Sequence, residues 1–246
     1  MNSLSILKAL GPIDAKNIRR DEMLRWIVLA PIALALALRL LAPLLLTRIE
    51  EILNIEFMAY YEPFAAFMII LLTPYLAGMV IGFLLLDQRD DGTLTALQVT
   101  PLSLNGYLVY RLTMPMLVSI LATLVAEPLS DLFDMSFGVL LLTAVSAAPL
   151  APIFALLLAS LAQNKVQGFA LAKVAGVVLI PPMIAYFITA PWQIIFGIFP
   201  TYWPAMTLWS AQDGDPMFWF YWSVGLVYQI VFLALLTRCF NKIMQQ

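Results

Sequence analysis

The chain has 246 residues, of which 63% are hydrophobic and 11% are charged, and its net charge is −2. Soluble domains carry about 25% charged residues, so this composition excludes a water-soluble protein, and the charge balance gives no indication of nucleic-acid binding. The chain has no histidine and a single cysteine, Cys239, which excludes histidine-based catalysis and thiolate metal clusters. We therefore expect no catalytic, metal-binding or cofactor-binding residues on this chain.

Residues 1–25 precede the first apolar run and predict an interfacial helix on the cytoplasmic side of a membrane. Leucines share one helical face at Leu4, Leu7 and Leu10. We expect Gly11-Pro12 to end that helix and Asp14 to begin a second, charged helix that continues to Glu22. A partly disordered basic leader is the alternative.

Residues 26–246 are dominated by six long apolar runs. A spanning helix needs roughly 20 mainly apolar residues to cross a hydrocarbon core of about 30 Å. The expected spans are Trp26–Leu46, Pro63–Leu86, Leu108–Pro128, Phe137–Ala162, Val166–Ala190 and Met217–Thr237. They leave no room for a separate soluble domain, so the sequence predicts an all-α polytopic membrane protein with a single six-helix transmembrane domain.

The charged residues are distributed asymmetrically about these spans. Lysines and arginines occupy the N-terminal segment, the second and fourth connections and the C-terminal tail, whereas the other connections are acidic and hold Arg48 as their only cation. Positively charged connections generally remain on the cytoplasmic side of a membrane. We therefore expect both termini to be cytoplasmic and the chain to lie in the inner (plasma) membrane of the cell.

Arg39 lies deep in the outer half of the first span. A charge at such a depth costs at least about 2.5 kcal/mol unless its side chain reaches the headgroups or finds a partner. Snorkelling of Arg39 to the outer headgroups is one expectation. A buried ion pair with Glu127, which would join spans one and three, is the other.

Two glycines in the second span, Gly78 and Gly82, form a GxxxG face on which another helix can approach closely. Apolar helices also contain this spacing by chance, so the pattern leaves both a packing role and no role open. Prolines within the spans predict kinks, at Pro74, Pro115, Pro149, Pro152, Pro181 and Pro182.

Residues 191–216, between spans five and six, are too apolar for a free loop and too rich in proline for a span. Their aromatic residues are Trp192, Phe196, Phe199, Tyr202, Trp203 and Trp209. We expect an external hairpin of re-entrant or surface-lying helices. A simple aromatic belt at the membrane–water boundary is the alternative.

The most polar connection between spans occupies residues 87–107. Its apolar residues have the spacing of a short amphipathic helix, at Leu94, Leu97, Val99 and Leu102. Gly92-Thr93 can end one helix and cap the next, and Thr100-Pro101 would stop the second. This pattern predicts a cytoplasmic helix that fits a groove on a partner; an ordinary solvated loop is the alternative.

Residues 90–103, followed by Tyr107-Leu-Val-Tyr-Arg111, resemble the signature of the ABC-2 type permeases. In that family the signature forms the coupling helix that contacts a nucleotide-binding subunit, and the segment from Lys16 to Asp21 is similar to the family's connecting helix. Gln98 and Arg111 stand where Leu and Lys are usual, and the Asp-Asp variant resembles the drug-export branch that includes fluoroquinolone export permeases. The implied coupling residues are Asp87, Arg89, Asp90, Asp91, Gly92, Thr93, Leu94, Leu97, Thr100 and Pro101.

This resemblance implies the membrane-spanning subunit of an ABC exporter for an amphipathic or hydrophobic drug, lipid or peptide. It also implies external helices that roof the translocation path, and two permease chains that pair with two ATPase subunits carrying ATP and Mg. The chain has no G-x-x-x-x-G-K-[ST] loop, so ATP hydrolysis would belong to another polypeptide. The alternatives are an integral-membrane enzyme and a non-transporting immunity or assembly protein.

Overall fold

A computed structural model of the chain describes residues 3–53, 58–91, 104–131, 135–188 and 190–244. Within these ranges every regular element is a helix, and six segments are long and apolar enough to cross a membrane. The elements are α1 (Ser3–Arg20), α2 (Glu22–Leu40), α3 (Ala42–Leu53), α4 (Met58–Asp90), α6 (Leu104–Ser130), α7 (Phe137–Ala147), α8 (Leu150–Leu161), α9 (Lys165–Ala175), η1 (Gly176–Leu179), α10 (Ile180–Tyr186), η2 (Pro191–Ile198), α11 (Tyr202–Gln212) and α12 (Phe218–Met244). The predicted all-α polytopic fold with six spans is confirmed.

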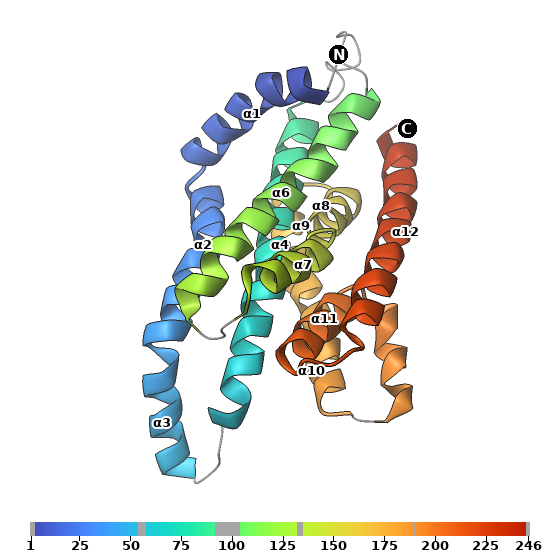
Figure 1. Cartoon of the computed structure of the whole chain (residues 1–246). Helices are drawn as coiled ribbons and strands as arrows, with labels where there is room; N and C mark the ends of the chain where they lie inside the picture. The colour runs from blue at the N-terminus through green and yellow to red at the C-terminus, as the bar shows by residue number, and fades with distance from the viewer. Residues whose placement is uncertain (1–2, 54–57, 92–103, 132–134, 189, 245–246) are drawn as a thin grey trace.

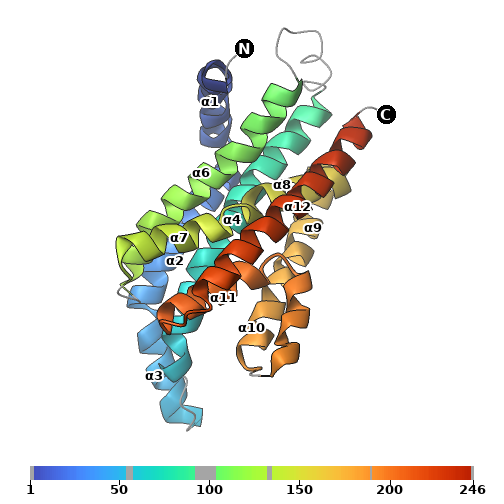
Figure 2. The ribbon, with the colours of Figure 1, turned by 45° about the vertical axis from the view of Figure 1, so that its right-hand side comes forward.

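Helix α4 runs through the centre of the bundle, where it packs against α2, α6, α8 and α11 (Figures 1 and 2). Its span is mostly buried inside the protein, as is the span formed by α7 and α8, whereas less than a third of each of the other four spans is buried. Both chain termini lie at one end of the bundle, named the terminal end here, and α3 and α10 lie at the other (Figure 1).

The closest approach of α4 to α8 involves the two glycines of the GxxxG pattern. A Cβ atom added at Gly78 would overlap the carbonyl oxygen of Ala151, and one added at Gly82 would lie 2.7 Å from a methyl group of Leu158. Small residues allow such contact because van der Waals packing between backbones drives helix association in lipid.

The predicted helix break at Gly11-Pro12 is wrong, because α1 continues through both residues to Arg20. A proline inside a helix removes one hydrogen bond and crowds the carbonyl four residues earlier. Packing of Leu10 and Ile18 against the core holds α1 on both sides of Pro12. The chain instead breaks at Asp21, which is extended and caps α2 by accepting a hydrogen bond from the Leu24 amide at 3.1 Å. The position of α1 at a membrane interface stays a prediction.

Regular helix is interrupted near a proline in three of the spans, because proline has no N–H to bond to the carbonyl four residues earlier. Pro43 follows the break between α2 and α3, so the first apolar run forms two helices instead of one. Pro149 stands at the start of α8, and Pro181 follows the 3₁₀ turn η1, which interrupts the fifth span before α10 ends at Tyr186. By contrast, α4 and α6 each contain internal prolines without a break.

Residues 191–216 form η2 and α11, and α11 packs inside the bundle against α12, α7 and α4. Trp203 and Trp209 are buried. The indole nitrogen of Trp203 donates to the Gly197 carbonyl at 2.9 Å, and the Trp209 ring stacks on Phe67 with centroids 5.4 Å apart. These aromatic side chains therefore pack in the protein interior, whereas the depth of the hairpin in the bilayer stays a prediction.

Replacing Gly78 by alanine tests the contact between α4 and α8. We expect a loss of about 1–3 kcal/mol of stability, because the added methyl group meets backbone and forces the helices apart. The thermal unfolding midpoint of the purified protein in lipid nanodiscs measures the effect. Gly138→Ala is the control: nothing lies within 4 Å of its added Cβ, so equal destabilisation by both variants would refute the packing argument.

Candidate partner-coupling site

The two described ends of the predicted coupling segment, the end of α4 and the start of α6, lie at the terminal end of the bundle (Figures 1 and 2). Asp87 and Arg89 belong to the last turn of α4, and Asp90 and Asp91 are exposed at its end. The other predicted coupling residues lie outside the described residues: Gly92, Thr93, Leu94, Leu97, Thr100 and Pro101. The described part of the site therefore consists of the two ends of this connection and the side chains that hold them.

A buried ion pair holds the start of α6 to α1. The guanidinium of Arg111, 1% exposed, donates to both carboxylate oxygens of Asp14 at 2.7 and 3.1 Å. The Tyr110 hydroxyl donates to the same carboxylate at 2.8 Å, and the Tyr107 hydroxyl accepts from Arg111 Nε at 3.1 Å. We name these four residues the Arg111 cluster.

The geometry of the Arg111 cluster compensates for the cost of burying two charges. A buried pair is stable only when its remaining donors and acceptors are also satisfied, and here a bidentate contact and two tyrosine hydroxyls meet that condition. The two tyrosine rings also lie 5.3 and 5.5 Å from the guanidinium carbon, within the range of cation–π attraction. The cluster therefore fixes α1 rigidly on α6.

Tyr107 extends this cluster to α4. Burial raises the pKa of its hydroxyl, which therefore stays protonated and donates to Gln88 Oε1 at 2.5 Å. This contact joins the last turn of α4 directly to the first turn of α6. Both ends of the coupling connection are thus bound to each other and, through Arg111, to α1.

A second group, the Lys165 bridge, consists of Asp21, Asp87 and Lys165. The ammonium group of Lys165 donates to Asp21 at 2.8 Å and to Asp87 at 3.1 Å. Lys165 is the first residue of α9, where a cation is unfavourable next to the helix dipole, and the two carboxylates offset that cost. The bridge joins the start of α2, the end of α4 and the start of α9 at one point.

Arg89 faces into the protein instead of outward to a partner. Its guanidinium donates to the carbonyl oxygens of Ala159 and Ala162 at 3.2 and 2.6 Å. These are the last carbonyls of α8, which lack partners within their helix, so the cation satisfies them and complements the helix dipole. Of the predicted coupling charges, Asp87 and Arg89 therefore brace the bundle, and Asp90 and Asp91 face outward.

A polar hollow of about 750 Å³ adjoins these groups at the terminal end. It lies between α1, the start of α2 and the end of α4, and its charged lining comprises Arg20, Asp21, Asp87, Asp90, Asp91 and Lys165. Because acids outnumber bases in this lining, the hollow favours a partner surface that presents basic side chains.

The expected ion pair between Arg39 and Glu127 is wrong. Arg39 instead binds Asp131 at 2.9 Å and donates to the Leu129 carbonyl at 3.3 Å. Asp131 adopts a left-handed φ of 54° directly after α6, which places its carboxylate against α2. An ion pair thus joins spans one and three, but the acid is Asp131 and not Glu127. The side chains of Arg39 and Asp131 both remain partly exposed.

Glu127 is 1% exposed, and its Oε1 atom has no hydrogen-bond partner among the described residues. The contacts of Arg39 with Asp131 and Leu129 leave this carboxyl group without the cation that the sequence suggested. An ionisable group inside a membrane bundle is costly to keep. The described contacts of Glu127 therefore do not offset the free-energy cost of burying its carboxyl group in the bundle.

Sequence analysis missed Asp14, Tyr107, Tyr110 and Lys165 as site residues. One signal was available, since Tyr107, Tyr110 and Arg111 fall at i, i+3 and i+4 and thus share one face of a helix. No local pattern identifies Asp14, because its partner lies 97 residues away along the chain.

Six helices able to span a membrane, with both termini at one end of the bundle, define this chain as a multi-pass membrane protein. The profile of the family described as "Fluoroquinolones export permease protein Rv2686c-like" matches residues 14–237. The chain belongs to this family, whose name indicates a transporter subunit rather than an enzyme.

Two relatives come from Mycobacterium tuberculosis: Fluoroquinolones export permease protein Rv2686c, from strain ATCC 25618 / H37Rv, and Fluoroquinolones export permease protein MT2760, from strain CDC 1551 / Oshkosh. Each is 30% identical over 237 residues, which cover 96% of this chain and 94% of the relative. No solved structure matches the chain at a significant level.

Replacing Asp14 by alanine should cost about 3–5 kcal/mol of stability, because Arg111 is left buried without a counter-charge. The double variant Asp14→Leu, Arg111→Met should be much closer to the wild type, since it removes both charges. Thermal unfolding in nanodiscs measures both effects. Arg48→Ala, which breaks an exposed pair with Glu51, is the control and should change stability by less than about 1 kcal/mol; a double variant as unstable as Asp14→Ala would contradict this account.

The Lys165 bridge should make stability depend on pH in the acid range. The hydrogen bond from Lys165 lowers the pKa of Asp21 below its ordinary value of 3.8, so the folded state favours the carboxylate. The resulting stabilisation, about 1 kcal/mol at most, is present above that value and is lost as the pH falls through the lowered pKa.

Asp21→Asn is the matched variant for this dependence, because asparagine caps a helix as well as aspartate does. Chemical unfolding at a series of pH values should show the wild type more stable than Asp21→Asn near pH 7, and the two converging in acid. A difference between them that does not change with pH would rule out the ion pair as its cause.

Proposed function

We propose that this chain is the membrane-spanning subunit of an ATP-driven ABC exporter, and that residues 87–107 transmit work from a separate ATPase subunit. The observation that carries this proposal is the bracing of both ends of that connection. Gln88 and Asp87 tie the end of α4 to α6, α2 and α9, and Arg111 ties the start of α6 to α1. A displacement of the connection therefore has to move several helices together.

In this proposal the terminal end faces the cytoplasm of a cell whose inner (plasma) membrane holds the bundle. The asymmetric distribution of lysine and arginine supports this orientation. The hollow beside Asp90 and Asp91 is then accessible to a cytoplasmic ATPase, and its excess of acids suits a basic docking surface. ATP and Mg would bind to that subunit.

Helix α4 is the element through which such work would reach the membrane interior. It is the central helix of the bundle, and Arg89 links its end to the end of α8. Because α4 and α8 contact each other closely at Gly78 and Gly82, we infer that they move as one unit. The surrounding helices then shift against this unit when the ATPase subunits close.

The cargo that we propose is an amphipathic or hydrophobic molecule, and the names of the relatives point to fluoroquinolones. Such a molecule would leave between two permease chains, each with its own ATPase subunit. The family name supports export over the alternatives of a membrane enzyme or a non-transporting assembly or immunity protein.

ATP hydrolysis by the cognate ATPase, alone and with this chain in nanodiscs, tests the proposal. We expect the chain to stimulate hydrolysis, and Asp91→Arg or Leu97→Asp to reduce the stimulation by about tenfold, a typical size for coupling between sites. Thermal unfolding of the Asp91→Arg variant should match the wild type, because Asp91 is exposed.

Asp213→Arg is the matched control, because it makes the same charge change at an exposed residue far along the chain, in the hairpin before α12. It should leave the stimulation unchanged. Full stimulation by the Asp91→Arg and Leu97→Asp variants would remove the basis for assigning this segment to an ATPase.

A further inference from the structure

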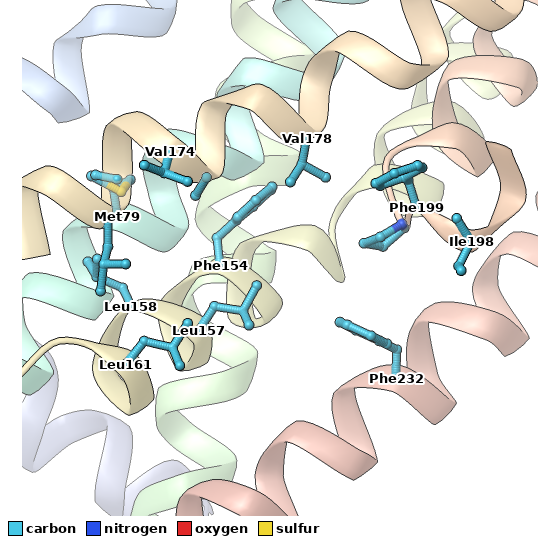
Figure 3. Close-up of a pocket in the computed structure, with 14 residues that line it drawn as sticks. Met79, Phe154, Leu157, Leu158, Leu161, Val174, Val178, Ile198, Phe199 and Phe232 are labelled. Carbon is cyan, nitrogen blue, oxygen red and sulfur yellow. The ribbon is translucent and has the colours of Figure 1, made fainter.

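A cavity of about 330 Å³ lies within the spanning part of the bundle, bounded by α4, α8, α9, η1, the residues after η2 and α12 (Figure 3). Its lining side chains come from apolar residues throughout, and Phe154, Leu157 and Val178 point into it opposite Phe232 (Figure 3). Small-molecule sites have volumes of about 300–1,000 Å³. The cavity is therefore large enough to bind part of an apolar molecule.

Both 3₁₀ helices of the structure lie at this cavity, with Val178 in η1 and Ile198 in η2 among its lining residues. Irregular backbone at membrane depth is tolerated only where it is buried in protein or lines a cavity. In transporters, broken helices also mark binding sites. The fold thus departs from regular helix at the place where the cavity is formed.

Hydroxyl groups of the protein bind three backbone carbonyl groups at the cavity, two in the 3₁₀ helices and one in α9. Thr201 donates to the Val178 carbonyl at 2.7 Å, Tyr228 donates to Ile198, and Tyr75 donates to Ala172. Each of the three carbonyls belongs to a residue that lines the cavity. The cavity therefore offers hydrocarbon contacts and has little capacity to bind a polar group.

The cavity is open to the surroundings of the bundle along one side. Its rim residues Leu161, Val174 and Ile198 are 62%, 65% and 70% exposed. Leu161 and Val174 belong to candidate spans, so in a membrane their part of the rim faces acyl chains. A lipid acyl chain that enters from the bilayer would break no hydrogen bond of the protein and would gain packing contacts.

Basic residues on two helices that bound the cavity, neither of which lines it, indicate which lipid would provide that acyl chain. No Asp or Glu occurs between Met135 and Gln212, or from Met217 to the last residue. Lys173 of α9 and Arg238 of α12 are exposed, and neither forms an ion pair within the described residues. Lys173 lies about 12 Å along α9 from its first residue, a depth from which lysine reaches the headgroups.

We propose that the cavity binds one acyl chain of an anionic phospholipid from the leaflet at the terminal end, with its headgroup at Lys173 and Arg238. Basic groups between spanning helices recognise anionic headgroups in this way. The site goes beyond export itself, because it needs neither the ATPase nor a cargo. A bound chain would fill the space between α12 and the pair formed by α8 and α9.

Photolabelling of the full chain in nanodiscs tests the proposal. The probe is a phosphatidylglycerol with a diazirine within one acyl chain, and peptide mapping locates the adducts. We expect adducts on Leu157 and Val174 well above the level on Leu44, an exposed residue of α3 remote from the cavity. Ala175→Trp, which fills the cavity, should remove this excess.

Ala170→Trp is the matched control, because Ala170 is an exposed residue of the same helix that does not line the cavity. It should leave the labelling unchanged. In the double variant Lys173→Gln, Arg238→Gln, the phosphatidylglycerol probe should no longer label the cavity more strongly than Leu44. Labelling by a phosphatidylcholine probe should be the same in this variant and in the wild type.

Three results would overturn the proposal. The first is equal labelling of the cavity and Leu44, which would indicate ordinary annular lipid. The second is equal labelling by the two probes in the wild type. The third is displacement of the probe by a fluoroquinolone, which would make the cavity a cargo site. Because no ATPase is present, failure here is distinguishable from failure of the coupling proposal.

Discussion

The arrangement at the terminal end depends on the ion pair between Asp14 and Arg111. Two charges buried at about 1% and 9% side-chain exposure are stable only with complete hydrogen bonding, and that requirement fixes the positions of Tyr107 and Tyr110 as well. Through Tyr107 and Gln88 the same constraint reaches α4. The amphipathic helix α1 is thereby bound to the bundle through Asp14.

Two kinds of contact hold α4 to its neighbours: charged hydrogen bonds at its last turn and close packing further into the bundle. At the terminal end, Lys165 and Arg89 bind α4 to its neighbours through directed hydrogen bonds, which fix the register of the helices. Further into the bundle, contact depends on the absence of side chains at Gly78 and Gly82. Charged contacts can break and re-form when water or a partner competes, whereas close backbone packing persists. Water or a partner can therefore compete with the exposed contacts at the terminal end, but not with the contact between α4 and α8.

The sequence predicted the features that depend on composition and local pattern. The length of the apolar runs identified all six spans, and prolines such as Pro149 and Pro181 marked places where helices break. The predicted break at Pro12 failed, because tertiary contacts of α1 outweigh one lost hydrogen bond. Arg39 selected Asp131 over Glu127 because the left-handed turn after α6, which no apolar periodicity reveals, places that carboxylate within reach.

The burial of α11 has a consequence for how the protein is made. Helix α11 is enclosed by α4 and α7, which precede it in the chain, and by α12, which follows it. A segment of this length cannot insert alone as a span, and it has no complete binding surface until α12 has entered the bilayer. Assembly of this part of the molecule therefore has to await the synthesis of α12, which completes the surface that encloses α11.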